Sequence, residues 1–182
     1  MRGRALAAPS DLRVRPTSDK VRQAMFNILS HNDFDCGFTL DGARVADLFA
    51  GTGAMGLEAI SRGVKYCLFV EDAAESRALI RENVEAFALT GATKIWRRNA
   101  TDLGPMGPGA GGPFDLVFLD PPYRKALIAP ALASLRDGGW LAPNAILVCE
   151  CAADEDVPDT ERLVRLDGRV YGETRVVVLR FN

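Results

Sequence analysis

Residues 45–56 read Val-Ala-Asp-Leu-Phe-Ala-Gly-Thr-Gly-Ala-Met-Gly, an apolar run that leads into three closely spaced glycines. Such apolar runs are typical of buried strands in parallel sheets. Gly51 and Gly53 allow a tight turn close to a ligand, and Gly56 allows a helix to pack closely on the sheet. The segment therefore predicts a strand, a glycine turn and a helix that begins at Ala54.

An acidic residue follows at the spacing that nucleotide-binding folds of this type use. Glu71 comes 20 residues after Gly51, at the end of a second apolar run, 66–70. A carboxylate there can accept hydrogen bonds from both hydroxyls of a ribose. Strand, turn, helix and spaced acid together predict a nucleoside-cofactor site.

Asp47 helps to choose among nucleoside cofactors. A dinucleotide places its pyrophosphate at the N-terminus of this helix, where backbone amides favour anions. Asp47 lies four residues before Gly51 and would repel that pyrophosphate. Its carboxylate suits an ammonium or sulfonium group, and S-adenosylmethionine carries both. Two alternatives stay open: Asp47 bonds only loop amides, or the chain is a nicotinamide-dependent reductase with the same glycine turn.

Asp120-Pro121-Pro122-Tyr123 is the second informative stretch, and it directly follows an apolar run, 114–119. Two prolines end a strand rigidly, at the sheet edge where open α/β folds bind ligands. The Asp120 carboxylate and the Pro121 carbonyl offer two hydrogen-bond acceptors, and the Tyr123 ring offers a stacking surface. This set suits a planar ring with an exocyclic amino group, although an ordinary proline turn is the structural alternative. We therefore predict Asp120, Pro121, Pro122 and Tyr123 as the catalytic residues.

Strand-like and helix-like segments alternate along the chain, which predicts a mostly parallel, doubly wound α/β sheet. An antiparallel hairpin is expected at the C-terminal end. The glycine- and proline-rich stretch 104–113 predicts a mobile connection with little or no helix. The expected strands are 45–49, 66–70, 93–97, 114–119, 145–151, 161–170 and 174–181, and the expected helices are 17–29, 54–62, 73–89 and 130–135.

The first 25 residues carry six basic and two acidic side chains, so their net charge is +4 and the remaining residues carry −6. A basic arm on an acidic body suggests a local contact with nucleic-acid phosphates, although a solvated, frayed terminus would look similar. We divide the chain into a basic arm with its leading helix, 1–30, and a globular unit, 31–182. The predicted RNA-binding residues are Arg2, Arg4, Arg13, Arg15, Thr17, Lys20, Arg22, Arg124 and Lys125.

At this level of detail the chain resembles the bacterial RsmD-type methyltransferases. That family transfers a methyl group from S-adenosylmethionine to the exocyclic N2 of a guanine in small-subunit ribosomal RNA. The resemblance implies the same activity, a Rossmann-like class I methyltransferase fold, S-adenosylmethionine as cofactor, and ribosomal RNA or a small-subunit assembly intermediate as partner. The similar segments are RPTSDKVRQAMFNIL at 15–29, DLFAGTGAMGLEA at 47–59, VED at 70–72, LDPPY at 119–123 and GGWLAP at 138–143.

The resemblance also completes the expected cofactor site. In methyltransferases, the position that Asn99 and Ala100 occupy commonly meets the adenine ring. The predicted cofactor-binding residues are Asp47, Phe49, Ala50, Gly51, Gly53, Glu71, Asp72, Asn99 and Ala100.

Composition argues against several other classes of protein. No apolar run approaches the roughly 20 residues that cross a bilayer, and the N-terminus lacks the apolar core of a signal peptide. Four cysteines without metal-binding spacing and a single histidine, His31, argue against a zinc site. We expect a cytoplasmic monomer without a metal, with reduced, packed thiols and with His31 facing solvent beyond a helix end.

Two functional alternatives remain beside guanine N2 methylation. The same Pro-Pro-Tyr motif suits other amino groups, such as adenine N6 in DNA or RNA, or a protein amide. A non-catalytic RNA-binding assembly factor is the alternative from another class, and the intact 120–123 stretch argues against it.

Overall fold

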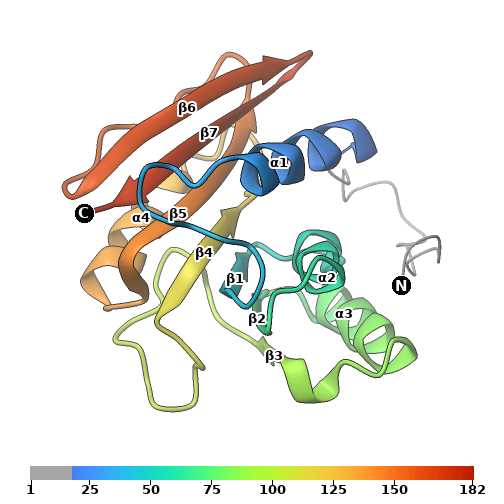
Figure 1. Ribbon diagram of the computed structural model, residues 1–182. Helices are drawn as coiled ribbons and strands as arrows, with labels where there is room; N and C mark the ends of the chain where they lie inside the picture. Colours follow the sequence, from blue (N-terminus) through green and yellow to red (C-terminus); the bar gives the residue numbers. More distant parts are fainter. Residues whose placement is uncertain (1–17) are drawn as a thin grey trace.

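A seven-stranded sheet runs through the protein, and the computed structural model describes residues 18–182. The strand order is β3-β2-β1-β4-β5-β7-β6. The first five strands run parallel, and β7 is antiparallel to both β5 and β6 (Figure 1). The predicted doubly wound sheet with a C-terminal hairpin is therefore confirmed. The strands are β1 (Arg44–Leu48), β2 (Tyr66–Val70), β3 (Thr93–Trp96), β4 (Phe114–Leu119), β5 (Leu141–Ala152), β6 (Leu163–Tyr171) and β7 (Thr174–Phe181).

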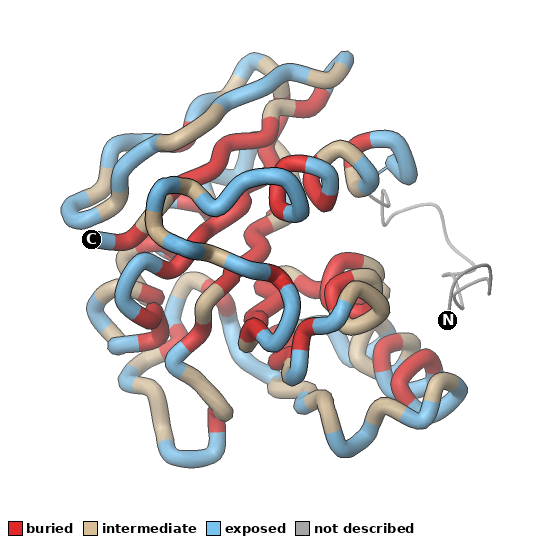
Figure 2. Tube along the Cα trace, viewed as in Figure 1, coloured by how far each residue is buried: buried red, intermediate tan, exposed pale blue. Residues whose placement is uncertain are grey.

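Helices cover both faces of this sheet, and its central strands β1, β4 and β5 are mostly buried between them, whereas the edge strand β6 is largely exposed (Figure 2). Alternate residues of a strand point to opposite faces. In β5, Val148 joins a core cluster with α1, α2 and α3, whereas Leu147 joins a second cluster with α4. Each face of the sheet thus has its own apolar core. The helices are α1 (Asp19–His31), α2 (Ala54–Ser61), α3 (Ala74–Ala86) and α4 (Ile128–Asp137), with a short 3₁₀ turn η1 (Thr90–Ala92).

Helix α1 is capped by Ser18, close to the start of the predicted helix 17–29. The Ser18 hydroxyl accepts a hydrogen bond from the Val21 amide at 3.3 Å, which satisfies an amide that the first turn leaves unpaired. The helix continues to His31, so this residue lies in the last turn and not beyond the helix end as predicted. Its side chain is exposed, and Nδ1 donates to the Asn27 carbonyl at 2.8 Å.

Two elements that contain a proline begin earlier in the structure than predicted. Helix α4 begins at Ile128, two residues before Pro130, because a proline is tolerated in the first turn where its missing amide is not needed. Strand β5 begins at Leu141, four residues before the predicted start. Pro143 fits there because the pairing of β5 with β4 is irregular between Phe114 and Leu116, and bulges accept proline.

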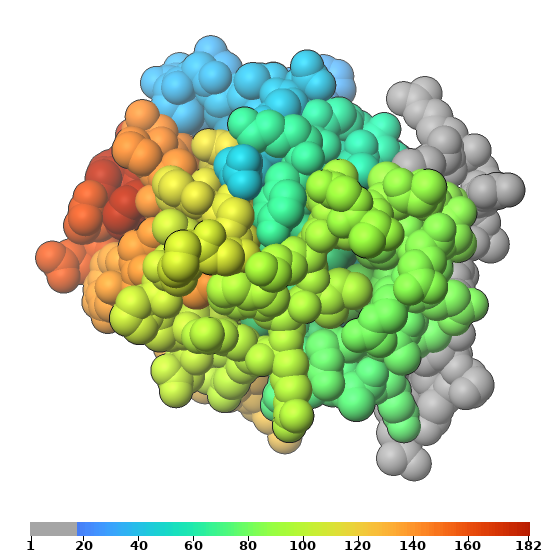
Figure 3. Space-filling view, turned by 90° about the horizontal axis from the view of Figure 1, so that it is seen from below, coloured from blue at the N-terminus to red at the C-terminus, as the bar shows by residue number. Residues whose placement is uncertain are grey.

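The connection over residues 97–113 contains no helix, as predicted, but it is anchored and not a free loop. The Tyr66 hydroxyl donates to the Ala110 carbonyl at 3.2 Å, and the Trp140 indole donates to the Gly104 carbonyl at 2.8 Å. The Lys94 ammonium donates to a third carbonyl of the loop at 2.6 Å. Figure 3 shows the segment spread over the lower end of the molecule. Composition does not reveal these long-range anchors, and the expected mobility of the connection stays a prediction.

The cysteines are packed thiols, as predicted. Cys67, Cys149 and Cys151 are buried, Cys36 is half-buried, and all four are free. Burial is the main reason that the pKa of Cys151 rises to about 11, so this thiol stays protonated at neutral pH. None of the helices within residues 18–182 is long and apolar enough to cross a membrane.

Candidate cofactor and target site

Three neighbouring strands end side by side at one edge of the sheet. The register places Leu48 of β1 opposite Val70 of β2 and Leu119 of β4. The segments that follow, 49–53, 71–73 and 120–123, therefore meet at the carboxyl edge, where open α/β sheets bind ligands. The fold thus brings the predicted cofactor and catalytic segments together.

The glycine turn is built from left-handed backbone conformations. Phe49, Gly51 and Gly53 have φ of 59°, 54° and 78°. The Gly53 amide donates to the Ala50 carbonyl at 2.7 Å, and Gly53 is the residue that caps α2. A positive φ is costly for a phenylalanine. Phe49 is therefore a strained position of the turn, and no sequence pattern predicts that strain.

Gly56 lets α2 lie close to β2. A Cβ atom at this position would meet the Phe69 ring and would lie 2.6 Å from the Cys67 sulfur. Only glycine avoids this overlap, so the predicted role of Gly56 in close helix–sheet packing is confirmed.

Glu71 links the glycine turn to the start of α3. One carboxylate oxygen accepts from the Gly51 amide at 2.8 Å, and the other accepts from the Ala73 amide at 2.8 Å. A carboxylate oxygen can accept more than one hydrogen bond, so these bonds are compatible with a role toward ribose hydroxyls. The side chain of the neighbouring Asp72 is exposed.

Asp47 is a buried carboxylate beneath the turn, with 2% of its surface exposed. One oxygen accepts from the Gly56 amide at 2.9 Å, which is the structural role left open by the sequence. Burial raises the pKa of Asp47 well above its usual range; the Gly56 bond opposes this rise, and the charges of Asp120 and Glu71 add to it. Three carboxylates around one turn fit a cationic ligand such as S-adenosylmethionine and disfavour a pyrophosphate.

Asn99 and Ala100 follow β3 at the same edge but differ in exposure. The Asn99 side-chain oxygen accepts from the amide and the hydroxyl of Thr101 at 2.9 and 2.8 Å, which closes an exposed turn. Ala100 is 3% exposed and belongs to the core on the α4 side. A contact between Ala100 and a cofactor would therefore use its backbone.

The Asp120–Tyr123 turn directly follows β4. Pro121 is buried, Pro122 is exposed, and Asp120 and Tyr123 are half-buried. The Tyr123 hydroxyl donates to Glu150 Oε1 at 2.6 Å and lies 2.9 Å from the Thr174 hydroxyl. Burial, and next the bond to Glu150, raise the pKa of Tyr123.

Glu150 is the residue of this site that the sequence motifs did not single out. It is 4% exposed, within the apolar strand β5. Glutamate is almost never fully buried without a partner. An acid inside a run of buried strand residues was therefore the available signal, but its partner could not be named from the sequence.

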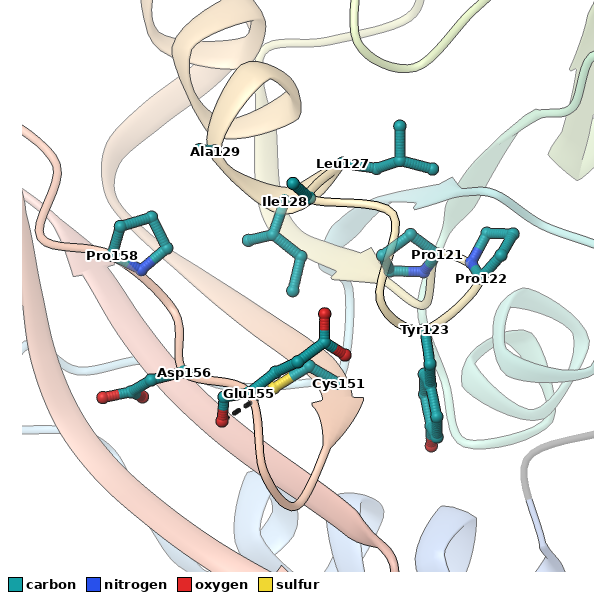
Figure 4. Close-up of a pocket in the computed structure, with 11 residues that line it drawn as sticks. Pro121, Pro122, Tyr123, Leu127, Ile128, Ala129, Cys151, Glu155, Asp156 and Pro158 are labelled. Atoms are coloured by element: carbon teal, nitrogen blue, oxygen red, sulfur yellow. Dashed lines mark hydrogen bonds between the residues drawn. The ribbon is translucent and has the colours of Figure 1, made fainter.

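A cavity of about 290 Å³ lies beside the turn (Figure 4). Figure 4 shows the Tyr123 side chain pointing away from Ile128 and Pro158.

The Glu155 carboxylate accepts from the Arg124 amide at 2.9 Å and from the Ala152 amide at 3.1 Å. These bonds join the loop after β5 to the chain that directly follows the Asp120–Tyr123 turn.

The predicted RNA-binding residues are only partly within the described part of the chain. Arg22 pairs with Asp19 at 2.6 Å, and Arg124 pairs with Asp154 at 3.0 Å. Exposed ion pairs of this kind contribute little stability, so a phosphate could replace either acid. Lys20 and Lys125 are exposed. The remaining predicted residues, which lie outside residues 18–182, are Arg2, Arg4, Arg13, Arg15 and Thr17.

Known proteins resemble this chain in sequence over most of its length. The family model described as Conserved hypothetical protein 95 matches residues 1–180. The ribosomal RNA small subunit methyltransferase D of Escherichia coli strain K12 is 35% identical over 158 residues, which cover 86% of this chain and 74% of that protein. The protein of the same name from Haemophilus influenzae is 30% identical over 174 residues, which cover 94% and 85%.

Two solved structures extend the similarity to the fold. The structure of the Escherichia coli protein yhhF has a TM-score of 0.81 at 28% identity and covers 99% of this chain and 93% of that chain. An RNA methyltransferase from Salinibacter ruber, solved with S-adenosyl-L-homocysteine, has a TM-score of 0.67 at 13% identity, over 92% and 94% of the chains, and is similar in fold alone. With the family model and the sequence relatives, the similarity confirms what the motifs predicted: the chain belongs to the RsmD family of methyltransferases.

Proposed function

We propose that this protein transfers a methyl group from S-adenosylmethionine to the exocyclic N2 of a guanine in small-subunit ribosomal RNA. Its curated relatives are ribosomal RNA small subunit methyltransferases, so ribosomal RNA is the substrate class and S-adenosylmethionine is the methyl donor. The finer assignment to guanine N2 is supported above all by the Asp120–Tyr123 turn. This turn lies beside the glycine turn, with Asp120 close enough to Asp47 to raise its pKa.

S-adenosylmethionine supplies an activated methyl group on a positively charged sulfur. We assign Asp47 to the electrostatic attraction of its cationic groups and Glu71 to its ribose hydroxyls. The amides of Ala50, Gly51 and Gly53 already donate to Val70, Glu71 and Ala50, so its carboxylate would meet the other amides of the turn 49–53. Asp72 with the backbone of residues 99 and 100 would border its adenine. The three acidic side chains around the turn support a cationic cofactor in this role.

Asp120 and the Pro121 carbonyl would hold the amino group that accepts the methyl. The lone pair of guanine N2 is delocalised into the ring and is weakly nucleophilic. When two acceptors bind its two N–H groups, the nitrogen can rehybridise and direct its lone pair at the methyl. Positive charge then develops on this nitrogen, so the acceptors stabilise the transition state more than the ground state. The acidified N–H loses its proton after the transfer, and no strong base is needed beforehand.

Tyr123 would stack on the target base, an interaction worth about 1–3 kcal/mol. Extracting a base from its stack costs a few kcal/mol, so stacking alone roughly offsets the cost. Further contacts with RNA phosphates are needed, and we assign them to Lys20, Arg22, Arg124 and Lys125 with the basic residues of the arm. A guanine in a loop, already partly unstacked, would lower the cost further.

Transfer of tritium from labelled S-adenosylmethionine tests this function. The acceptors are naked small-subunit ribosomal RNA, isolated small subunits, DNA and protein, each followed by digestion and separation of the products. The expected product is N2-methylguanosine, from the RNA or from the particle. Label in N6-methyladenosine or in protein would instead support the other amino-group substrates that the Pro-Pro-Tyr motif allows.

A further inference from the structure

The Tyr123 hydroxyl connects the catalytic turn to two strands that are distant in sequence. It bonds Glu150 of β5 at 2.6 Å and lies 2.9 Å from the hydroxyl of Thr174, the first residue of β7. These contacts span 27 and 51 residues of the chain. The C-terminal hairpin, which lies beside β5 in Figure 1, thus reaches the turn that carries the predicted catalytic residues.

The two partners of Tyr123 are rigidly held, whereas the turn itself is not part of a helix or strand. Glu150 and Thr174 are 4% and 7% exposed, in adjacent paired strands. The chain after Tyr123 is exposed over residues 124–126. A functional side chain on a loop is positioned best when residues of the rigid scaffold fix its rotamer, and this hydroxyl supplies that connection.

Stability alone is a poor reason for an acid at position 150. Burying a carboxylate is costly unless hydrogen bonds compensate the lost solvation, and the preceding residue on the same face of β5 is the apolar Val148. A distance of 2.6 Å lies at the short end of the range for O–H···O hydrogen bonds, so the two side chains are in close, directional contact. The bond therefore fixes where the Tyr123 ring lies.

We propose that Glu150 and Thr174 are positioning residues that hold the Tyr123 ring in place for stacking on the target base. This inference rests on the proposed function, because it takes Tyr123 as the platform for that base. A misplaced platform would leave the amino group away from Asp120 while cofactor binding on the other side of the turn continues. A displacement of about 1 Å in such a site can lower the rate about 100-fold.

Four single variants test the inference by separating the rate from binding. Glu150→Ala removes the acceptor, Glu150→Gln keeps an acceptor oxygen at the same reach, and Thr174→Val removes the second hydroxyl. Thr93→Val is the matched control, because its hydroxyl bonds the Leu89 carbonyl at the opposite end of edge strand β3. The measurements are kcat and KM for RNA at saturating S-adenosylmethionine, and Kd for S-adenosylmethionine by calorimetry.

We expect Glu150→Ala to lower kcat about 100-fold without a change in the Kd for S-adenosylmethionine. Glu150→Gln should keep most of the wild-type kcat, and Thr93→Val should match the wild type. Thr174→Val should lower kcat about 10-fold, a loss between those of the two Glu150 variants. An unchanged kcat in Glu150→Ala would overturn the inference, as would an equal loss in Glu150→Gln. If Glu150→Ala does not fold, the other two variants decide: an unchanged kcat in Thr174→Val, or a loss of about 100-fold in Glu150→Gln, would overturn the inference.

A double variant identifies the residue through which Glu150 acts. Tyr123→Phe alone removes the hydroxyl, so adding Glu150→Ala to it should cause no further loss of kcat, since the two changes remove the same interaction. A full additional loss would overturn the inference, because Glu150 would then act by another route. Failure of the proposed function would be distinct: the wild-type protein would then methylate no guanine N2, whatever the variants do.

Discussion

The carboxyl edge of the sheet has two halves that are held together in different ways. In the cofactor half, residues 47–56 and 71–73, carboxylates accept from backbone amides of the strand–turn–helix unit: Asp47 from Gly56, nine residues away, and Glu71 from Gly51, 20 residues away. In the target half, the turn 120–123 with Glu150 and Thr174, side chains from three distant segments bond one another. Backbone amides donate whatever side chain they carry, whereas a bond between side chains needs both partners. The cofactor half can therefore be recognised from a local motif, and the target half cannot.

Asp120→Ala should have the largest effect, a loss of turnover without a loss of cofactor binding. It removes an acceptor for the amino group, and the loss of one preorganised group that meets developing charge costs about 100- to 1000-fold in rate. We expect turnover to fall by at least that factor, to below detection in an ordinary assay, while the Kd for S-adenosylmethionine stays within a few-fold. Methyl transfer and calorimetry measure the two effects, and Asp159→Ala, an exposed acid after β5, is the control. Retained turnover would contradict the role assigned to Asp120.

Glu71→Ala should give the opposite result, weaker binding of the cofactor with little loss of turnover. The substitution removes a charged acceptor for the ribose hydroxyls, and each bond of this kind contributes about 1.5–3 kcal/mol. We expect the Kd for S-adenosylmethionine to rise about 100-fold, with kcat at saturation largely preserved. Glu82→Ala, an exposed acid of α3, should leave both unchanged. A normal Kd in Glu71→Ala would show that Glu71 only supports the Gly51 and Ala73 amides.

Gly56→Ala should test how tightly the cofactor half is packed. The new methyl group would overlap the Phe69 ring and the Cys67 sulfur, and overpacking of this kind typically costs about 1–3 kcal/mol. Urea denaturation should show that decrease in the free energy of unfolding. Gly91→Ala is the matched control, since a Cβ there has nothing within 4 Å, and an equal loss in both variants would contradict the packing argument.

Asp47→Asn should show the smallest effect, and its sign depends on pH. Burial raises the pKa of Asp47, so the protonated form stabilises the fold at low pH, and this contribution is lost as pH rises through the raised pKa. The asparagine variant should therefore gain stability relative to the wild type at pH 8 and lose that advantage at acidic pH. A cationic ligand favours the ionised carboxylate, so affinity for S-adenosylmethionine should rise with pH in the wild type more than in the variant. Denaturation at several pH values measures the stability, and calorimetry measures the affinity for S-adenosylmethionine. The same pH dependence of affinity in the wild type and in the variant would contradict the assigned charge interaction.

The two halves also explain which predictions from the sequence held. The glycine turn, the strand that precedes it and the packing role of Gly56 follow from local patterns, because apolar runs and glycines act within one strand–turn–helix unit. The start of β5 at Leu141 and the anchors of residues 97–113 depend on partners far along the chain, such as Trp140 with Gly104. Glu150 is the clearest case, since its chemistry was visible in the sequence but its partner, Tyr123, was fixed only by the pairing of β4, β5 and β7.

Replacing the target guanine with inosine tests the central claim most directly. Inosine lacks the exocyclic N2 amino group and otherwise keeps the shape of the base, so it removes only the group that Asp120 and the Pro121 carbonyl would hold. Once the methylated nucleotide of small-subunit ribosomal RNA has been mapped, RNA with guanosine or inosine at that position is incubated with the wild-type protein and labelled S-adenosylmethionine. We predict N2-methylguanosine from the first RNA and no methylation of the second. Equal methylation of the inosine RNA would contradict the proposed chemistry.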